Sequence, residues 1–182
     1  MGGPKALMSV AGEPWWRVQS RRLAEAGIEA TWVVSPAVLR VLCDQTGAPS
    51  SLVAADPDAP MFASVIAGVQ ALADTRPNGL FVLPVDTPAP ARRVWSVLLG
   101  SDRPRVPAWR GRSGHPVFLP WSIAEELVRL AANQGHAADA PRLDHVIGPT
   151  AEVIEVDDPT VCMNLNTPSD IDQYLTSLRR AE

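Results

Sequence analysis

The sequence predicts an α/β protein with a three-layer, Rossmann-like, mostly parallel sheet and an antiparallel excursion. Three observations lead to this fold class. Short apolar runs typical of strands alternate with helical segments in the first half of the chain. These runs are apolar throughout, which is typical of strands covered by helices on both faces. In the second half, two strand-like runs flank a turn-rich Arg-Gly-Arg-Ser-Gly stretch, which predicts an antiparallel pair.

The first half of the chain contains the alternating elements. A helix is expected to begin near Pro14, because proline suits a first helical turn, and to stop at Gly27. A strand over 30–35 and a helix from 36 to about 46 follow. The next predicted elements are a strand at 51–55, a helix at 62–74 and a buried strand at 79–86.

The second half changes character. The antiparallel pair is predicted at 105–109 and 115–120. Helices are predicted at 121–133, at about 142–147 and from 168 onward, with a strand at 151–156. At 182 residues the chain is long enough for one substantial core, so we expect a single domain over residues 1–182.

Composition excludes several classes of function. The net charge of −4 argues against a nucleic-acid partner, because binding to a polynucleotide needs a broad basic surface. No apolar run approaches the roughly 20 residues of a membrane span, and no signal peptide is evident, so we expect a cytoplasmic protein that binds no membrane. The two cysteines are too few for a disulfide framework. Both are expected to be small buried side chains.

The opening Gly-Gly-Pro-Lys stretch is similar to the end of a phosphate-binding loop. Gly2 and Gly3 would let the backbone approach an anion, and Lys5 would supply a positive charge. Such loops normally follow a buried strand, and no strand precedes this one in the sequence. The alternative is an N-terminal segment without a function.

Asp86 follows a buried strand directly, where ligands of α/β sheets collect. A carboxylate there can hold a hard cation such as Mg²⁺, which takes few protein ligands besides substrate phosphates. A turn-forming or capping aspartate before a helix at Pro90 is the alternative. Position alone favours neither interpretation.

Two asparagines precede the last predicted helix. Thr167, Pro168 and Asp170 have a structural explanation, because they form a capping box with a proline in the first turn. That explanation leaves out Asn164 and Asn166, which alternate along an extended segment and so present their side chains on one face. They are candidate ligands of a metal or substrate.

Two further candidates lie in the middle of the chain. His115 stands between Gly114 and Pro116, with two arginines nearby that attract anions. Ser64 lies at the start of the helix at 62–74, where it serves either the first turn or a ligand near the positive end of the helix dipole. For both residues an ordinary structural role is the alternative.

Five segments together resemble the MobA-like nucleotidyltransferases: Met-Gly-Gly-Pro-Lys-Ala-Leu, Ala-Gly-Ile with a later Val-Val, Pro-Val-Asp-Thr-Pro, Gly-Arg-Ser-Gly-His-Pro-Val-Phe-Leu and Asn-Leu-Asn-Thr-Pro-Ser-Asp. They occur in the family's order over nearly the whole chain. The Gly-His-Pro stretch is most similar to the molybdenum cofactor cytidylyltransferases. This resemblance implies transfer of CMP from CTP to a phosphate-bearing molybdopterin acceptor, with Mg²⁺ as cofactor and release of pyrophosphate.

The resemblance also implies a role for each candidate residue. Gly2, Gly3, Lys5 and Ser64 would bind the nucleotide, and Gly114 and His115 would bind the acceptor. Lys5 and Asp86 would be catalytic, while Asp86, Asn164 and Asn166 would hold the metal. A protein of molybdoenzyme maturation is a further expected partner. Phosphoryl-type transfer needs mainly positioning, a divalent ion and cations, so these residue types suit the chemistry.

The chain departs from the family pattern at its start. The family has an apolar strand, a Leu-Ala-Ala-Gly segment and an arginine directly before the stretch matched by 1–5. The first strand and most of the loop are therefore expected to be missing, which would open the core and weaken triphosphate binding. Two explanations stay open: the sequence starts downstream of the true start, or rearrangement or a partner chain fills the place. A non-catalytic nucleotide- or protein-binding relative and a transferase with another small phosphate acceptor are the alternative functions.

Overall fold

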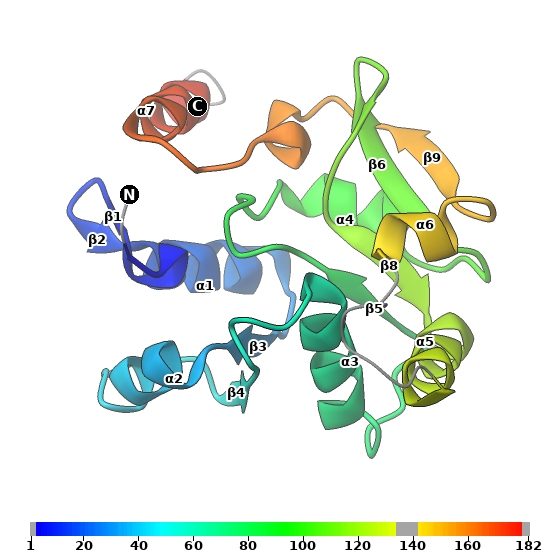
Figure 1. Cartoon of the computed structure of the whole chain (residues 1–182). Coiled ribbons are helices and arrows are strands. Elements are labelled where there is room, and N and C mark those ends of the chain that lie inside the picture. Colours follow the sequence, from blue (N-terminus) through cyan, green and yellow to red (C-terminus); the bar gives the residue numbers. More distant parts are fainter. Residues whose placement is uncertain (1–2, 134–141, 180–182) are drawn as a thin grey trace.

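The computed structural model describes residues 3–133 and 142–179 and confirms an α/β fold (Figure 1). The first half contains η1 (Lys5–Leu7), β1 (Ser9–Val10), β2 (Glu13–Pro14), α1 (Trp15–Ala26), β3 (Thr31–Val34), α2 (Pro36–Cys43), β4 (Ser51–Ala54), α3 (Met61–Ala71) and β5 (Gly79–Val82). The second half contains α4 (Arg92–Leu98), β6 (Arg105–Trp109), β7 (Arg112–Ser113), β8 (Val117–Pro120), α5 (Trp121–Asn133), α6 (Leu143–Ile147), β9 (Glu152–Glu155), η3 (Pro159–Cys162) and α7 (Pro168–Arg179).

Local sequence signals explain where α1 and the first hairpin begin and end. Gly27 adopts the left-handed conformation, with φ 75°, and ends α1 as predicted. The short β1–β2 hairpin was not expected from the sequence. Its two turn residues, Ala11 and Gly12, both have positive φ (52° and 83°), which is the backbone that a two-residue hairpin turn requires.

The larger strands divide between two sheets. β3 and β4 form a parallel two-stranded sheet. The other sheet has five strands in the order β5-β8-β6-β7, with β9 pairing parallel to β6. β8 is antiparallel to both β5 and β6, and β7 is antiparallel to β6. The antiparallel part therefore reaches further into the sheet than the predicted pair alone.

β3 and β5 are not hydrogen-bonded to each other, although the same helices cover both. On one face, α3 lies against Val33 of β3 at Gly68 and shares a core cluster with Leu80 and Val82 of β5. On the other face, Trp32 of β3 and Phe81 of β5 belong to a second cluster. Among the residues 3–133 and 142–179, no strand lies between the two (Figure 1).

Burial is uneven across the strands. All four residues of β8 are buried, whereas every residue of β5 and three of the four in β3 are only partly buried. Trp15 and Trp16 belong to the core, as expected. The expectation of two buried cysteines was wrong, because Cys43 is exposed and Cys162 only half-buried. None of the described helices is long and apolar enough to cross a membrane.

Candidate functional site

Asp86 lies in a turn that directly follows β5. The turn is closed by a hydrogen bond of 3.1 Å from the Thr87 amide to the Pro84 carbonyl. The indole N–H of Trp15 donates to the Val85 carbonyl at 2.6 Å. The Asp86 carbonyl accepts from the Leu165 amide at 2.8 Å, so its backbone joins the segment that carries the two asparagines. The carboxylate is free to point elsewhere, and it caps no helix: the N-cap of α4 is Ala91.

Lys5 reaches that carboxylate from η1. Its ammonium donates to Asp86 Oδ2 at 2.6 Å and also to Asn166 Oδ1. Ala6, the next residue, is buried against Trp16 and anchors the short helical turn. The Lys5 and Asp86 side chains keep 39% and 21% of their surface exposed, so a ligand can reach the pair from solvent.

The segment between η3 and α7 supplies the two asparagines. Both are exposed, while Leu165 between them is fully buried and fixes the segment to the core. The Thr87 hydroxyl donates to Asn164 Oδ1 at 3.2 Å. The predicted capping box is confirmed: Asp170 Oδ2 accepts from the Thr167 amide at 2.7 Å, and the Asp170 amide donates to Thr167 Oγ1 at 3.2 Å.

Asp170 has one function that the capping box does not require. Its Oδ2 also accepts from the amide of Asn166 at 2.9 Å, which orients that residue toward Lys5. Hydrogen bonding by the side chain and the amide of Thr167 and by the amide of Asn166 holds the pKa of the Asp170 carboxyl below its ordinary value. Asp170 is therefore a charged anchor for the asparagine segment.

His115 lies close enough to Asp86 for the carboxylate to affect its titration. Burial lowers the pKa of the His115 imidazole below 6.5, and the Val82 carbonyl and the Asp86 charge oppose that shift. The ring is therefore neutral at neutral pH. Its Nδ1 is buried and has no hydrogen-bond partner within the described part of the chain.

Gly114 is required by packing. A Cβ at this position would lie 2.0 Å from the Val161 carbonyl oxygen, so only glycine fits. The His115 amide donates to the same carbonyl at 2.8 Å, and the Gly114 amide donates to Pro107 at 2.8 Å. This close approach is what directs the His115 backbone toward the end of β5. The acceptor contact expected for Gly114 stays a prediction.

Three other predicted residues are not joined to this cluster. Ser64 lies in the first part of α3 and makes no hydrogen bond to Lys5 or Asp86 in the residues that the structure describes. Gly3 is exposed, and a Cβ there would meet nothing within 4 Å, so space does not require glycine. Gly2 lies outside the described residues.

The oxygens around Lys5 are of the type that a hard cation prefers. One carboxylate oxygen and one amide oxygen converge on the ammonium, and a second amide oxygen, that of Asn164, accepts from the Thr87 hydroxyl. Carboxylate and amide oxygens are common ligands of Mg²⁺. In the described ranges, no group of three or more His, Cys, Asp and Glu residues forms a metal site. The donor set thus fits a cation that takes few protein ligands.

Sequence reasoning missed two residues that shape the Asp86 turn. Gln19 of α1 is buried, and its side chain donates to the Thr87 carbonyl at 2.7 Å and accepts from the Ala89 amide at 2.8 Å. Thr87 itself is fully buried. A glutamine among the apolar positions of a predicted helix is a signal that could have identified the first of them.

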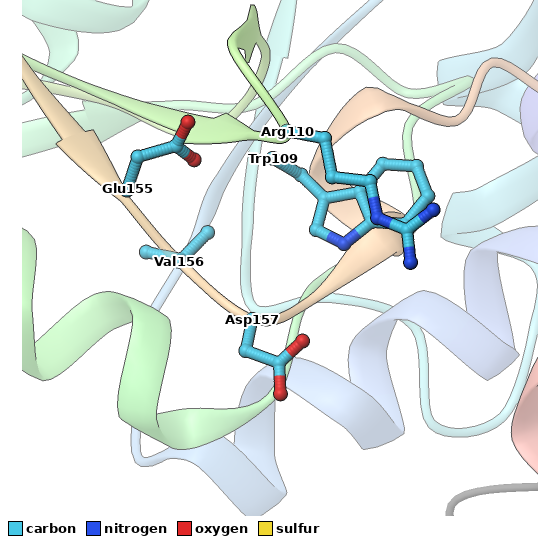
Figure 2. A pocket seen from close by; sticks show the side chains of 5 residues that line it. All are labelled: Trp109, Arg110, Glu155, Val156 and Asp157. Atoms are coloured by element: carbon cyan, nitrogen blue, oxygen red, sulfur yellow. The ribbon is translucent and has the colours of Figure 1, made fainter.

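An open cavity of about 400 Å³ lies elsewhere, beside the ends of β6 and β9 (Figure 2). Its walls are Trp109, Arg110, Glu155, Val156 and Asp157. Figure 2 shows the Arg110 guanidinium over the Trp109 ring, at 4.7 Å from its centroid. Arg110, one of the two arginines near His115 in the sequence, thus stacks on an aromatic face at this cavity.

The chain belongs to the MobA-like NTP transferase domain family, whose profile matches residues 1–146. Membership supports nucleotidyl transfer as the class of function, with a divalent metal as the general cofactor of the family. A search among curated proteins found no match in sequence.

Solved structures share the fold at low sequence identity. The molybdopterin-guanine dinucleotide biosynthesis protein A from Archaeoglobus fulgidus has TM-score 0.66 and 16% identity, covering 98% of this chain and 92% of its own. The 2-C-methyl-D-erythritol 4-phosphate cytidylyltransferase from Thermus thermophilus has TM-score 0.64 and 18% identity, covering 98% and 95%. Rv0371c from Mycobacterium tuberculosis, in complex with manganese, has TM-score 0.63 and 19% identity, covering 96% and 92%.

Proposed function

We propose that this protein transfers CMP from CTP to a phosphate-bearing acceptor of the molybdopterin type and releases pyrophosphate. The observation that carries the proposal is the convergence of Lys5, Asp86 and Asn166, which come from three distant parts of the sequence. A cation beside converging hard oxygens at the end of a strand is the arrangement that a triphosphate and its metal require. Membership of the family supports the reaction class.

In this proposal Asp86, Asn164 and Asn166 hold Mg²⁺: Asp86 and Asn166 present a carboxylate and an amide oxygen to Lys5, and Asn164 adds an amide oxygen beside Thr87. When bound, the ion would neutralise charge on the phosphate oxygens. Lys5 would then turn its ammonium from these oxygens to the triphosphate. An attacking oxygen of the acceptor phosphate forms a bond to the α-phosphorus while the bond to the β-phosphate bridging oxygen breaks, and pyrophosphate leaves.

The remaining predicted residues serve binding. Gly2, Gly3 and Ser64 would contact the nucleotide, and Gly114 and His115 the acceptor. The neutral His115 ring lies near Asp86, and its buried Nδ1 has no hydrogen-bond partner among the described residues, so it could hydrogen-bond the acceptor. A protein of molybdoenzyme maturation would receive the product, and the reaction would take place in the cytoplasm.

A non-catalytic nucleotide-binding relative is the second candidate. The contact of the Lys5 ammonium with Asp86 and Asn166 favours it, because the cation occupies the oxygens that a metal would need. Such a protein would bind a nucleotide through Lys5 without turning it over.

Titration calorimetry with CTP and with GTP, each with Mg²⁺, separates these functions when it is combined with an assay of pyrophosphate release. We expect binding selective for CTP and, with a molybdopterin acceptor, release of pyrophosphate. Selective binding without release would support the non-catalytic candidate. Absence of binding to either nucleotide would contradict both.

Asp86→Ala tests the site directly. We expect it to abolish Mg²⁺-dependent pyrophosphate release, because the only predicted carboxylate ligand is lost. Asp144→Asn is the control, since Asp144 of α6 is an exposed carboxylate that also pairs with a basic residue, the N-cap Arg142. Unchanged release in Asp86→Ala would remove Asp86 from the site.

A further inference from the structure

Another cavity, of about 260 Å³, lies between α3 and α5, two helices that pack against each other (Figure 1). We name it the α3–α5 pocket. Part of its wall is apolar and consists of Val69 in α3, Ala73 just beyond that helix, and Trp121 and Val128 in α5. Pockets for drug-sized ligands have about 300–1,000 Å³, so this one suits a smaller molecule with an apolar body.

The α3–α5 pocket lies at the opposite end of β5 from the candidate site. Pro120, the last residue of β8, pairs with Gly79, the first residue of β5. Trp121 follows directly, and its amide donates to the Asn78 carbonyl at 3.1 Å. Asp86, in contrast, comes after the last residue of β5. The pocket is therefore separate from the groups to which the nucleotide and its metal are assigned.

Charged side chains line the pocket beside its apolar wall. They are Arg76, Arg129 and Glu125. Arg129 pairs with Glu125 at 3.8 Å, but its side chain keeps 71% of its surface exposed, so this is a weak surface pair. Arg76 has no ion-pair partner within 3–133 and 142–179. Two guanidiniums against one carboxylate leave a local surplus of positive charge in a chain whose net charge is −4.

Arg76 has a backbone conformation that favours glycine. Its φ is 40°, in the turn that follows α3, where its amide donates to the Leu72 carbonyl at 3.2 Å. Glycine is the residue that most often ends a helix in this conformation, because it has no Cβ to clash. A charged side chain therefore stands at the pocket in a position where the local backbone favours none.

Trp121 has an indole N–H that packing does not use. The nitrogen is buried, and it has no acceptor in the part of the chain that the structure describes. A buried tryptophan usually finds a partner for this group, so phenylalanine would serve packing equally well. Because its ring lines the pocket, Trp121 is also a fluorescent reporter for a ligand there.

We propose that the α3–α5 pocket binds a small organic carboxylate. The carboxylate would lie between Arg76 and Arg129, because a guanidinium presents paired N–H donors that match two carboxylate oxygens. The apolar body would lie against Trp121 and the two valines of the wall. Inorganic phosphate gains nothing from that wall, so the pocket favours the organic anion. The proposal does not rest on the proposed transferase reaction, since binding can be measured without nucleotide.

The probe is benzoate, titrated into the whole chain and followed by calorimetry and by tryptophan fluorescence. Benzamide is the control without a charge, and inorganic phosphate is the control without an apolar body. We expect saturable binding of benzoate and affinities about tenfold or more weaker for both controls, because each lacks one of the two interactions.

Variants assign the binding to the pocket. Arg76→Gln and Arg129→Gln should each weaken benzoate binding about tenfold, since each removes a charge-assisted contact. Arg40→Gln is the matched control, because Arg40 is an exposed arginine in α2, outside the pocket lining, and should change nothing. Trp121→Phe should keep the heat of binding and lose most of the fluorescence response.

Arg76→Gly separates binding from stability. Glycine relieves the positive φ, so the variant should unfold at a higher urea concentration and still bind benzoate about tenfold more weakly. A loss of both stability and binding would contradict the assignment of this arginine to a ligand.

Four other outcomes would overturn the proposal. One is the absence of saturable benzoate binding, and another is equal affinity for benzamide or phosphate. A third is equal weakening by Arg40→Gln, which would assign the effect to general surface charge. The fourth is an unchanged fluorescence response in Trp121→Phe, which would place the probe elsewhere on the molecule.

Discussion

The β3–β4 sheet and the five-stranded sheet contain similar strands that differ in burial. β8 and β3 are both apolar and four residues long, and both have helices nearby. β8 lies between β5 and β6 and is fully buried, whereas β3 has a partner on one edge and is mostly half-buried. The comparison shows that the burial of a strand depends on the neighbouring strands at its two edges as well as on the helices that cover its faces. The following predictions test the difference.

The largest effect is expected at Gly114, beside β8. Gly114→Ala would place a Cβ 2.0 Å from the Val161 carbonyl oxygen, and the neighbouring atoms are backbone that cannot turn away. We expect a loss of about 3 kcal/mol or more in the free energy of unfolding. Urea unfolding followed by circular dichroism measures it. Gly3→Ala, with open space around its Cβ, should leave stability unchanged, and equal losses in both variants would contradict the packing explanation.

A matched pair of valines measures the difference between the sheets. Val117→Ala in the buried β8 should cost about 2 kcal/mol, because it leaves a cavity in a closed core. Val33→Ala in the half-buried β3 should cost about 1 kcal/mol, since less apolar surface is lost. Equal costs would remove the contrast between the two sheets.

The smallest effect is expected from the titration of His115. Its pKa is lowered from 6.5 in the folded protein, so the unfolded chain binds the proton more readily. The stability from the neutral ring is fully present above about pH 6.5 and is lost as the pH falls through the lower, folded pKa. The free energy of unfolding, measured at about pH 7.5 and pH 5.5, should show this loss in the unsubstituted protein and a smaller loss in His115→Gln. An identical pH dependence in both would exclude His115 as its source.

Much of the fold follows from local sequence signals. The order of helices and strands was predicted because apolar periodicity and helix-stop residues such as Gly27 act within a few positions. The capping box of Thr167 and Asp170 was predicted for the same reason. The β1–β2 hairpin was missed, because its turn depends on a positive φ at Ala11, a residue with no turn preference.

The candidate site was only partly predictable. The residue types indicated phosphate binding by Lys5 and metal binding by Asp86 and the asparagines. The contact of Lys5 with both Asp86 and Asn166 depends on tertiary structure, which these residue types do not show. The support from Gln19 was missed because residue type alone does not show that a glutamine is buried; its place among the apolar positions of the helix was the one available signal. Site roles for Ser64 and Gly114 stay predictions.

The hydrogen bonds of Lys5 also bear on when the site forms during protein synthesis. Its partners Asp86 and Asn166 lie 81 and 161 positions further along the chain. Closing loops of this length is slow and entropically costly, so the local helices and hairpins are expected to form first. A ribosome that has translated β8 has exposed Lys5 and Asp86 but has not yet made Asn166. The complete constellation is therefore a late product of translation, and a stalled nascent chain would carry a folded nucleus without a finished site.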